Sequence, residues 1–221
     1  MPGPGTTPEH ALHHLRAEIV SGALRPGQRV AQEEMAAALG VSVAPVREAL
    51  RVLEQEGQVT YLPRRGYFVT ELRMEDLEEI YALRKLLEAN AVRRALPTLD
   101  DDRLGEIAAA AQACTTAARA GDVTAELTAN RRLHFAILTA PQQPHAMRLI
   151  RLLWDGTEAY RALYYNAPAE RAASVAAHDR ILAAIADRDA DRLVAELDAH
   201  RERALEFLRG VLVPAAQVAA A

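Results

Sequence analysis

The chain has 221 residues, with 26 basic and 30 acidic side chains and a formal net charge of −4 at pH 7. Its composition, half hydrophobic and a quarter charged with one cysteine, excludes disordered and collagen-like chains, an intramolecular disulfide framework and a cysteine-rich zinc ribbon. The first residues, MPGPG, do not form a signal peptide, and no uncharged apolar run could span a bilayer, so we expect a cytoplasmic protein with no membrane partner.

The distribution of glycine and proline divides the chain near residue 72. Residues 1–72 contain most of the short-range turn signals, whereas residues 74–213 contain long stretches with helical periodicity. We therefore predict a mainly α fold with two domains, residues 1–72 and residues 73–221.

The first domain is predicted to contain three short helices followed by a β-hairpin. Gly40 provides the tight turn between the second and third helices. The helices are expected to begin at or near Thr7, Glu33 and Ser42. The hairpin strands are expected over 59–61 and 67–70, on either side of the turn 63–66. This order of elements is typical of a winged helix-turn-helix, a fold that binds DNA.

The candidate DNA contacts lie at the start of the third helix and at the tip of the hairpin. Arg47 can donate two hydrogen bonds to a guanine in the major groove, and arginines at the hairpin tip can reach phosphate or the minor groove. Residues 1–72 carry slightly more acidic than basic side chains, so the prediction depends on where the arginines lie rather than on net charge. The candidate residues are Ser42, Val43, Ala44, Arg47, Arg51, Arg64, Arg65 and Gly66.

Several motifs of this domain occur together in one known family. The segments IVSGALRPGQRV at 19–30, LGVS at 39–42, PVREAL at 45–50 and RGYFV at 65–69 resemble the DNA-binding domain of GntR-family bacterial transcription regulators. The resemblance implies a homodimer that binds a pseudo-palindromic operator in double-stranded DNA through the third helix and the wing. Many members have Arg-Thr after Gly-Val-Ser, where this chain has Val43-Ala44, so one expected contact is lost.

The second domain is predicted to be an all-α antiparallel bundle of six helices joined by short connections. The helices are expected over 74–96, 101–119, 122–140, 144–165, 168–187 and 189–212. Three histidines on three of these helices, His134, His178 and His200, lie on apolar stripes. A single buried histidine is more often a hydrogen-bonded core residue than a ligand, but three on three helices favour a shared site.

Spacing along the helices places these histidines at one level of the bundle. His178 and His200 lie at similar distances from a turn near residue 188, and Asn130 lies four residues before His134 on the same face. We therefore expect Asn130, His134, His178 and His200 to converge inside the bundle. Imidazole nitrogens suit Zn, Ni, Cu or Fe, and the amide oxygen of Asn130 is a weaker ligand.

The same motifs resemble the FCD domain, the effector-binding domain of the FadR-like branch of GntR regulators. NRRLH at 130–134 is similar to its Asp-x-x-Phe-His motif, with Asn130 in place of Asp, and HDRILAAI at 178–185 and DAH at 198–200 are similar to its other two histidine motifs. The resemblance implies a divalent metal, zinc or nickel, with an organic-acid effector at the same site. Six helices suggest the VanR-like subgroup.

The resemblance further implies that Arg84 faces the effector cavity and binds a carboxylate through its planar fork. The alternative for Arg84 is an exposed ion pair with Glu88, four residues later. Tyr160, Arg161 and Tyr164 are further candidates to line the effector pocket.

The sequence thus predicts a DNA-binding transcription regulator, in its simplest form a repressor that an organic acid releases, and not an enzyme. Two alternatives remain open. A three-histidine site with an open position can activate water, which would make the chain a metalloenzyme acting on a small carboxylate, although no inward general base is evident near the histidines. The other alternative is a DNA-binding regulator whose helical domain binds no metal.

Overall fold

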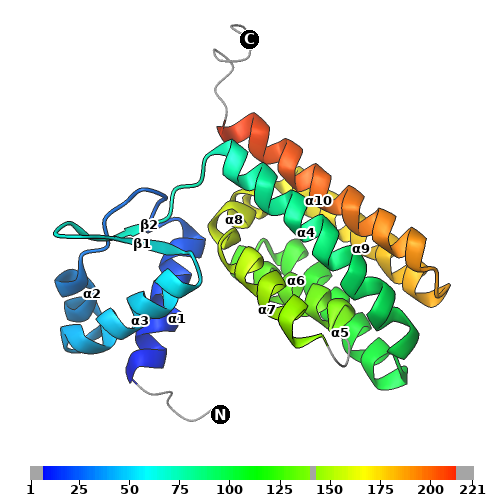
Figure 1. The fold of residues 1–221 in the computed structure, drawn as a ribbon, viewed down its shortest axis with the longest axis horizontal. Coiled ribbons are helices and arrows are strands. Elements are labelled where there is room, and N and C mark those ends of the chain that lie inside the picture. The colour runs from blue at the N-terminus through cyan, green and yellow to red at the C-terminus, as the bar shows by residue number, and fades with distance from the viewer. Residues whose placement is uncertain (1–6, 140–142, 213–221) are drawn as a thin grey trace, which may run out of the picture. The chain divides into compact units, whose positions relative to one another are not determined.

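The computed structural model describes residues 7–139 and 143–212. The two ends of the chain, residues 1–6 and 213–221, belong to the two expected domains but lie outside the described residues. The same holds for residue 140, the last residue of an expected helix. The chain divides into two compact units, Met1–Leu72 with Trp154–Ala159, and Arg73–Leu153 with Tyr160–Ala221. Figure 1 shows the elements of both units.

The described part of the first unit contains three helices and a hairpin in the predicted order. They are α1 (Thr7–Ser21), α2 (Gln32–Leu39), α3 (Val43–Gln55), β1 (Val59–Leu62) and β2 (Gly66–Val69). The two strands pair antiparallel, with Val59 opposite Val69. The helices bury apolar stripes at helical spacing, and the resulting core contains Leu15, Ile19, Val46, Leu50 and Leu53.

A tight turn at Gly40 and a further backbone pairing with β2 set the shape of this unit. Gly40 ends α2 in the left-handed conformation at φ +65°, and its N–H donates to the carbonyl groups of Ala36 and Ala37, so α3 begins three residues later. A segment that the sequence did not predict also pairs with β2. The N–H of Val30 donates to the carbonyl of Tyr67 over 2.8 Å, and the N–H of Val69 donates to the carbonyl of Gln28 over 2.9 Å.

The rest of the described chain is helical and has seven α-helices where the sequence predicted six. They are α4 (Met74–Ala95), α5 (Asp101–Ala120), α6 (Val123–Leu138), α7 (Pro144–Asp155), α8 (Glu158–Asn166), α9 (Pro168–Ala186) and α10 (Ala190–Leu212), with a 3₁₀ turn at Leu96–Thr98. The helix expected over 144–165 is two helices, separated at Gly156 and Thr157. The hydroxyl of Thr157 donates to the carbonyl of Trp154 over 3.2 Å, a local bond that competes with helix continuation. The count of six, which suggested the VanR-like subgroup, therefore becomes seven.

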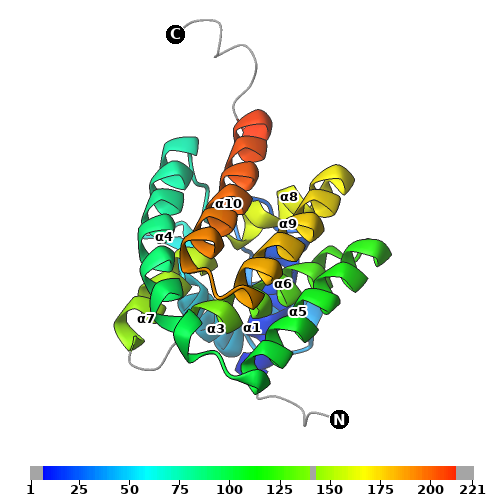
Figure 2. The ribbon, with the colours of Figure 1, turned by 90° about the vertical axis from the view of Figure 1, so that its right-hand side faces the viewer.

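Five of these helices pack in a ring. α4 packs against α10, α10 against α9, α9 against α5, α5 against α6, and α6 against α4. Figure 2 shows α4, α10, α9, α6 and α5 side by side around a common interior. Acidic caps start two of them, since Asp100 and Asp122 accept hydrogen bonds from the N–H groups of Arg103 and Ala125. Among the described helices, none is both long and apolar enough to cross a membrane.

Candidate metal centre and nucleic-acid interface

Three imidazoles from three helices of the ring meet in its interior. His134 on α6, His178 on α9 and His200 on α10 are all buried, and one potential ligand nitrogen of each lies within 4.8 Å of the others. The ring centroids are 5.1 Å apart for His178 and His200, 5.4 Å for His134 and His200, and 5.8 Å for His134 and His178. Three imidazoles in this arrangement can share one metal ion.

Asn130 completes the group that the sequence predicted. It is buried one helical turn before His134 on α6, and its side-chain oxygen Oδ1 lies 3.1 Å from Nε2 of His178. The structure thus brings together all four residues expected to converge, from α6, α9 and α10.

Burial keeps these imidazoles neutral. It lowers the pKa of His178 to about 4 and holds the pKa values of His134 and His200 well below the ordinary value. The positive charges of Arg84 and Arg201 lower the pKa values of His134 and His200 further. Nδ1 of His178 and Nδ1 of His200 are buried and have no hydrogen-bond partner among the described residues. A neutral imidazole with an available nitrogen is the form that binds a metal.

A buried network of charged side chains lies between α4 and α10. Nε of Arg84 donates to Oε1 of Glu88 over 2.9 Å, and the other carboxylate oxygen of Glu88 accepts from Arg201. Arg201 also donates to Asp198, which pairs with Lys85 at 3.3 Å. The side chains of Arg84 and Glu88 are 3% and 1% exposed, so the ion pair that the sequence offered as an exposed alternative exists but is buried.

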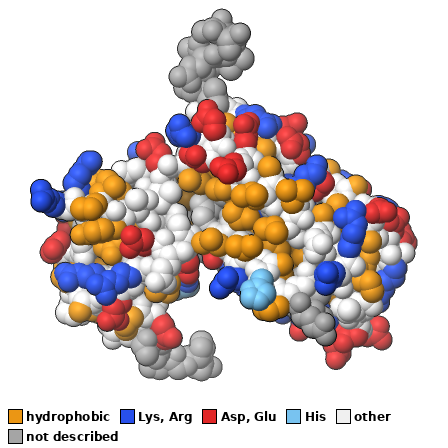
Figure 3. Space-filling model, in the orientation of Figure 1, with side chains coloured by type: hydrophobic (Ala, Val, Ile, Leu, Met, Phe, Trp, Pro, Cys, Tyr) orange, Lys and Arg blue, Asp and Glu red, His pale blue; other side chains and the backbone are white. Residues whose placement is uncertain are grey.

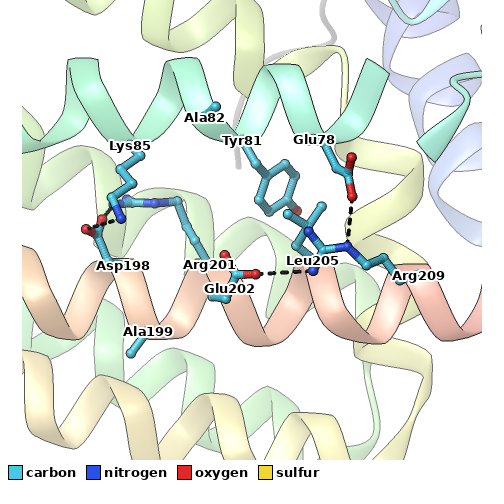
Figure 4. A pocket seen from close by; sticks show the side chains of 10 residues that line it. All are labelled: Glu78, Tyr81, Ala82, Lys85, Asp198, Ala199, Arg201, Glu202, Leu205 and Arg209. Atoms are coloured by element: carbon cyan, nitrogen blue, oxygen red, sulfur yellow. Dashed lines mark hydrogen bonds and ion pairs between the residues drawn. The ribbon is translucent and has the colours of Figure 1, made fainter. Parts of the chain in front are cut away.

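The network reaches the surface at a groove of about 520 Å³ between α4 and α10. Figure 4 shows Lys85 and Arg201 both directed at Asp198 in this groove, and Arg209 between Glu78 and Glu202. Arg201 was not among the residues predicted for the site, although it follows His200 directly, because it begins the charged run Arg201–Arg203, which is typical of a solvated face.

The other effector candidates lie on α8. Tyr160, Arg161 and Tyr164 are all buried. The ring of Tyr164 packs edge-on against Tyr165, with centroids 5.3 Å apart, and against Phe207 on α10, with centroids 5.7 Å apart. Burial raises the pKa of Tyr164 to about 12, so it is a neutral hydroxyl at neutral pH. A role for these three residues in effector binding stays a prediction.

In the first unit, α3 and the residue before it present four of the eight predicted DNA contacts to solvent. Ser42 precedes the helix with an extended backbone, and its side chain makes no capping hydrogen bond. Ser42, Ala44, Arg47 and Arg51 are exposed, whereas Val43 is partly buried and packs against the core.

The hairpin and α3 together form a second groove, of about 660 Å³, which is lined by Arg47, Arg51, Arg64 and Gly66. Gln32 and Tyr61, which the sequence analysis did not single out, also line it. Nε of Arg47 donates to Oε1 of Gln32 over 3.4 Å. No motif marks either residue, because each faces the groove only once α2, α3 and β1 have packed.

The hairpin tip has an unusual backbone. Arg64 has φ +65° and Gly66 has φ +93°, both in the left-handed region. Nε of Arg29 donates to the carbonyl of Arg65 over 3.0 Å, and the Arg65 guanidinium lies 5.2 Å from the centre of the Phe68 ring. Three arginines are therefore held at or beside the tip of the hairpin.

Sequence comparison matches both halves of the chain to known families. Residues 7–69 match "Bacterial regulatory proteins, gntR family", and residues 79–203 match "FCD domain". The Nta operon transcriptional regulator of Aminobacter aminovorans is 30% identical over 199 residues, which cover 87% of this chain and 92% of that protein. The HTH-type transcriptional regulator McbR of Escherichia coli (strain K12) is 30% identical over 196 residues, 86% of this chain and 89% of that protein.

Solved structures lead to the same family. E. coli McbR/YncC superposes with a TM-score of 0.80 at 26% identity, over 94% of this chain and 99% of that chain. A GntR transcriptional regulator from Rhodococcus sp. RHA1 superposes with a TM-score of 0.78 at 25% identity, over 93% of this chain and 99% of that chain. The relatives are regulators, which supports the expectation that the chain is not an enzyme. The chain belongs to the GntR family of bacterial transcription regulators, with an N-terminal DNA-binding helix-turn-helix domain and a C-terminal FCD domain.

Proposed function

We propose that this regulator is a cytoplasmic repressor whose FCD domain, within residues 73–221, binds one divalent metal ion, zinc or nickel, and a small organic acid that releases the operator. The observation that carries the proposal is the convergence of three buried, neutral imidazoles from three helices. Nδ1 of His178 and Nδ1 of His200 have no hydrogen-bond partner among the described residues, and a buried unsatisfied polar group is unfavourable by about 1–3 kcal/mol unless a ligand engages it.

The side chains present fit a divalent metal. His134, His178 and His200 offer nitrogens, Asn130 offers an oxygen, and burial excludes competing protons from the imidazoles. Oδ1 of Asn130 lies at hydrogen-bond distance, 3.1 Å, from Nε2 of His178, so the amide oxygen lies beside the imidazoles that would hold the ion. Such an ion would offer open positions to a carboxylate oxygen of the effector.

Arg84 and Arg201 supply the second half of an anion site. Their charges act on His134 and His200, so a carboxylate beside the imidazoles would lie in their field. Glu88 accepts from both arginines, and a guanidinium carries five N–H donors, so one guanidinium can contact more than one carboxylate. We therefore assign effector binding to Arg84 together with Arg201.

An exposed apolar surface supports dimerisation through the FCD domain. Leu83 and Leu86 on α4 and Leu149 and Leu152 on α7 are 42–71% exposed. Figure 3 shows hydrophobic side chains gathered over the face where α4 and α7 lie. We take the partner that covers this surface to be a second copy of the chain, because a pseudo-palindromic operator requires two α3 helices.

Leu86→Glu should give monomers in sedimentation equilibrium. Val211→Glu, which also replaces an exposed apolar side chain by glutamate but on α10, should not.

Release of DNA requires that the organic acid bind the two states of the dimer with different affinities. The test is fluorescence anisotropy with an operator selected from random DNA, at fixed salt, with zinc and a panel of small carboxylic acids. At least one acid should weaken operator binding by about fivefold or more, the lower end of typical allosteric coupling. Equal operator affinity under all conditions would refute the effector proposal and leave DNA binding intact.

A further inference from the structure

The candidate metal ligands carry no negative charge. Within the described residues, the cluster whose ligand atoms approach one another consists of three histidines and no carboxylate. Asn130, the fourth group, is a neutral amide. An imidazole binds a metal ion in its neutral form, so the three histidines would bring no charge to the ion.

The surroundings of this cluster are positive. The buried part of the network beside it contains Arg84 and Arg201 against one carboxylate, Glu88, a net charge of +1. The remaining pair, Lys85 with Asp198, lies toward the surface with side chains 64% and 22% exposed and adds no net charge. Both carboxylates already accept from arginine or pair with lysine. A divalent cation added alone would raise the local charge to +3 in a buried environment, where uncompensated charge is very costly.

We propose that this chain binds its divalent metal ion and its organic acid as a pair, each raising the affinity for the other, and that the acid carries at least two carboxylates. The inference rests on the proposed function and names its ligand class. One carboxylate would bind the metal and the other would bind Arg84 and Arg201, which restores the local charge to +1. The thermodynamic coupling is reciprocal, so metal must strengthen binding of the acid by the same factor.

Asn130 is the residue that makes the coupling necessary. Its oxygen contacts Nε2 of His178 at 3.1 Å, so a carboxylate at position 130 would place a fixed negative charge among the ligands. The protein would then neutralise half of the metal charge by itself. Asn130→Asp should therefore make metal binding largely independent of the acid.

The experiment measures zinc binding by the full-length protein after chelator treatment, with isothermal titration calorimetry. The probes are zinc chloride alone, zinc with malonate, and zinc with acetate, at equal ionic strength and with correction for zinc–malonate complexes. Malonate should raise zinc affinity by about tenfold or more, within the 5- to 150-fold range of typical allosteric coupling, and acetate should raise it less. Zinc should raise malonate affinity by the same factor.

The variants separate the inference from the proposed function. Asn130→Asp should raise zinc affinity in the absence of malonate by about tenfold and reduce the malonate effect, by the same coupling arithmetic. Asn90→Asp adds the same charge at an exposed position of α4 and should behave as the wild type. Equal zinc affinity of the wild type with and without malonate would overturn the inference and leave the metal site; this result needs no substitution. No zinc binding by the wild type or by Asn130→Asp, with or without malonate, would overturn the metal site itself.

Discussion

Asn130 and His178 are 48 positions apart in the chain, yet Oδ1 of Asn130 lies 3.1 Å from Nε2 of His178 inside the FCD domain. The contact joins α6 to α9. Because His134 lies one turn after Asn130 on α6, the same contact holds His134 and His178 at one level, with centroids 5.8 Å apart. The geometry of the candidate centre thus depends on how two helices pack, and not on a local loop.

Replacement of Arg47 by alanine should weaken operator binding and relax base preference. Arg47 is exposed near the start of α3, and a bidentate contact to a base is worth about 1–3 kcal/mol of discrimination, roughly 5- to 160-fold. Anisotropy with selected operators and single-base variants measures both effects. Arg25→Ala removes an exposed arginine outside the α3 groove and serves as the control. Unchanged affinity and base preference in Arg47→Ala would mean that α3 does not read the bases through this residue.

Arg64→Gly should weaken DNA binding without much effect on the stability of the protein. The left-handed φ of +65° is unfavourable for arginine by about 1 kcal/mol, and glycine removes that cost while gaining a similar entropy in the unfolded state. We expect the free energy of unfolding in urea to change little. DNA binding should weaken, and the slope of log affinity against log salt should become shallower by about 0.9, the loss of one phosphate contact. An unchanged salt slope would remove Arg64 from the DNA interface.

Gly66→Ala, in contrast to Arg64→Gly, should lower the stability of the protein. Gly66 has φ +93°, and a Cβ there would meet only the Arg29 side chain at 3.8 Å, an ordinary contact. The cost therefore comes from the backbone, and we expect the free energy of unfolding to fall by about 1 kcal/mol. Stability equal to that of the wild type would show that the hairpin tip adopts another conformation.

Substitutions in the Arg84–Glu88–Arg201 network should lower the free energy of unfolding by unequal amounts. Glu88→Gln leaves two buried guanidinium groups without the carboxylate that both contact, and should lower the free energy of unfolding by about 3–5 kcal/mol. Arg84→Gln should cost less, because Glu88 keeps Arg201 as a partner. Urea unfolding of both single variants and the double variant gives the coupling. A greater loss for Arg84→Gln than for Glu88→Gln would contradict the charge balance described here.

Because Glu126 is a buried carboxyl group, we expect the stability of the protein to fall as the pH rises toward neutral. It is 1% exposed on α6, neither carboxylate oxygen has a hydrogen-bond partner among the described residues, and burial raises its pKa to about 7. A carboxyl whose pKa is raised on folding stabilises the native state at low pH, and this stability is lost as the pH rises from about 4.5 through 7.

Glu126→Gln should abolish this loss. Relative to the variant, the wild type should become less stable by about 2 kcal/mol between pH 5 and pH 8, measured by urea unfolding. Glu206→Gln, a change at an exposed position of α10, should leave the pH dependence as in the wild type. Parallel pH profiles for wild type and Glu126→Gln would show that Glu126 is ionised at little cost in the folded protein.

The sequence predicted the histidine convergence because helical rise is regular. Counting residues on either side of the turn near residue 188 was enough to place His178 and His200 level, and their centroids are 5.1 Å apart. The same regularity predicted the Arg84–Glu88 pair. It did not predict the burial of that pair, because burial depends on Arg201, 113 positions after Glu88.

The features that the sequence did not predict depend on a few individual hydrogen bonds. Some of these bonds join segments that are distant in the sequence, and one competes locally with the continuation of a helix. The pairing of residues 27–30 with β2 involves too few residues to leave a periodic pattern. The break between α7 and α8 falls at Gly156 and Thr157, within a stretch where apolar spacing continues. Gln32 reaches Arg47 only after α2 and α3 have packed, so neighbouring residues in the sequence do not indicate it.

The most direct test of the central claim is the metal stoichiometry of the full-length protein, dialysed against zinc and malonate and measured by plasma mass spectrometry. We expect one zinc ion per chain for the wild type and for His145→Ala, which alters an exposed histidine of α7. His134→Ala, His178→Ala and His200→Ala should bind little or no zinc when circular dichroism shows that they are folded. Equal zinc in all five proteins, or none in the wild type, would refute a metal centre at these histidines.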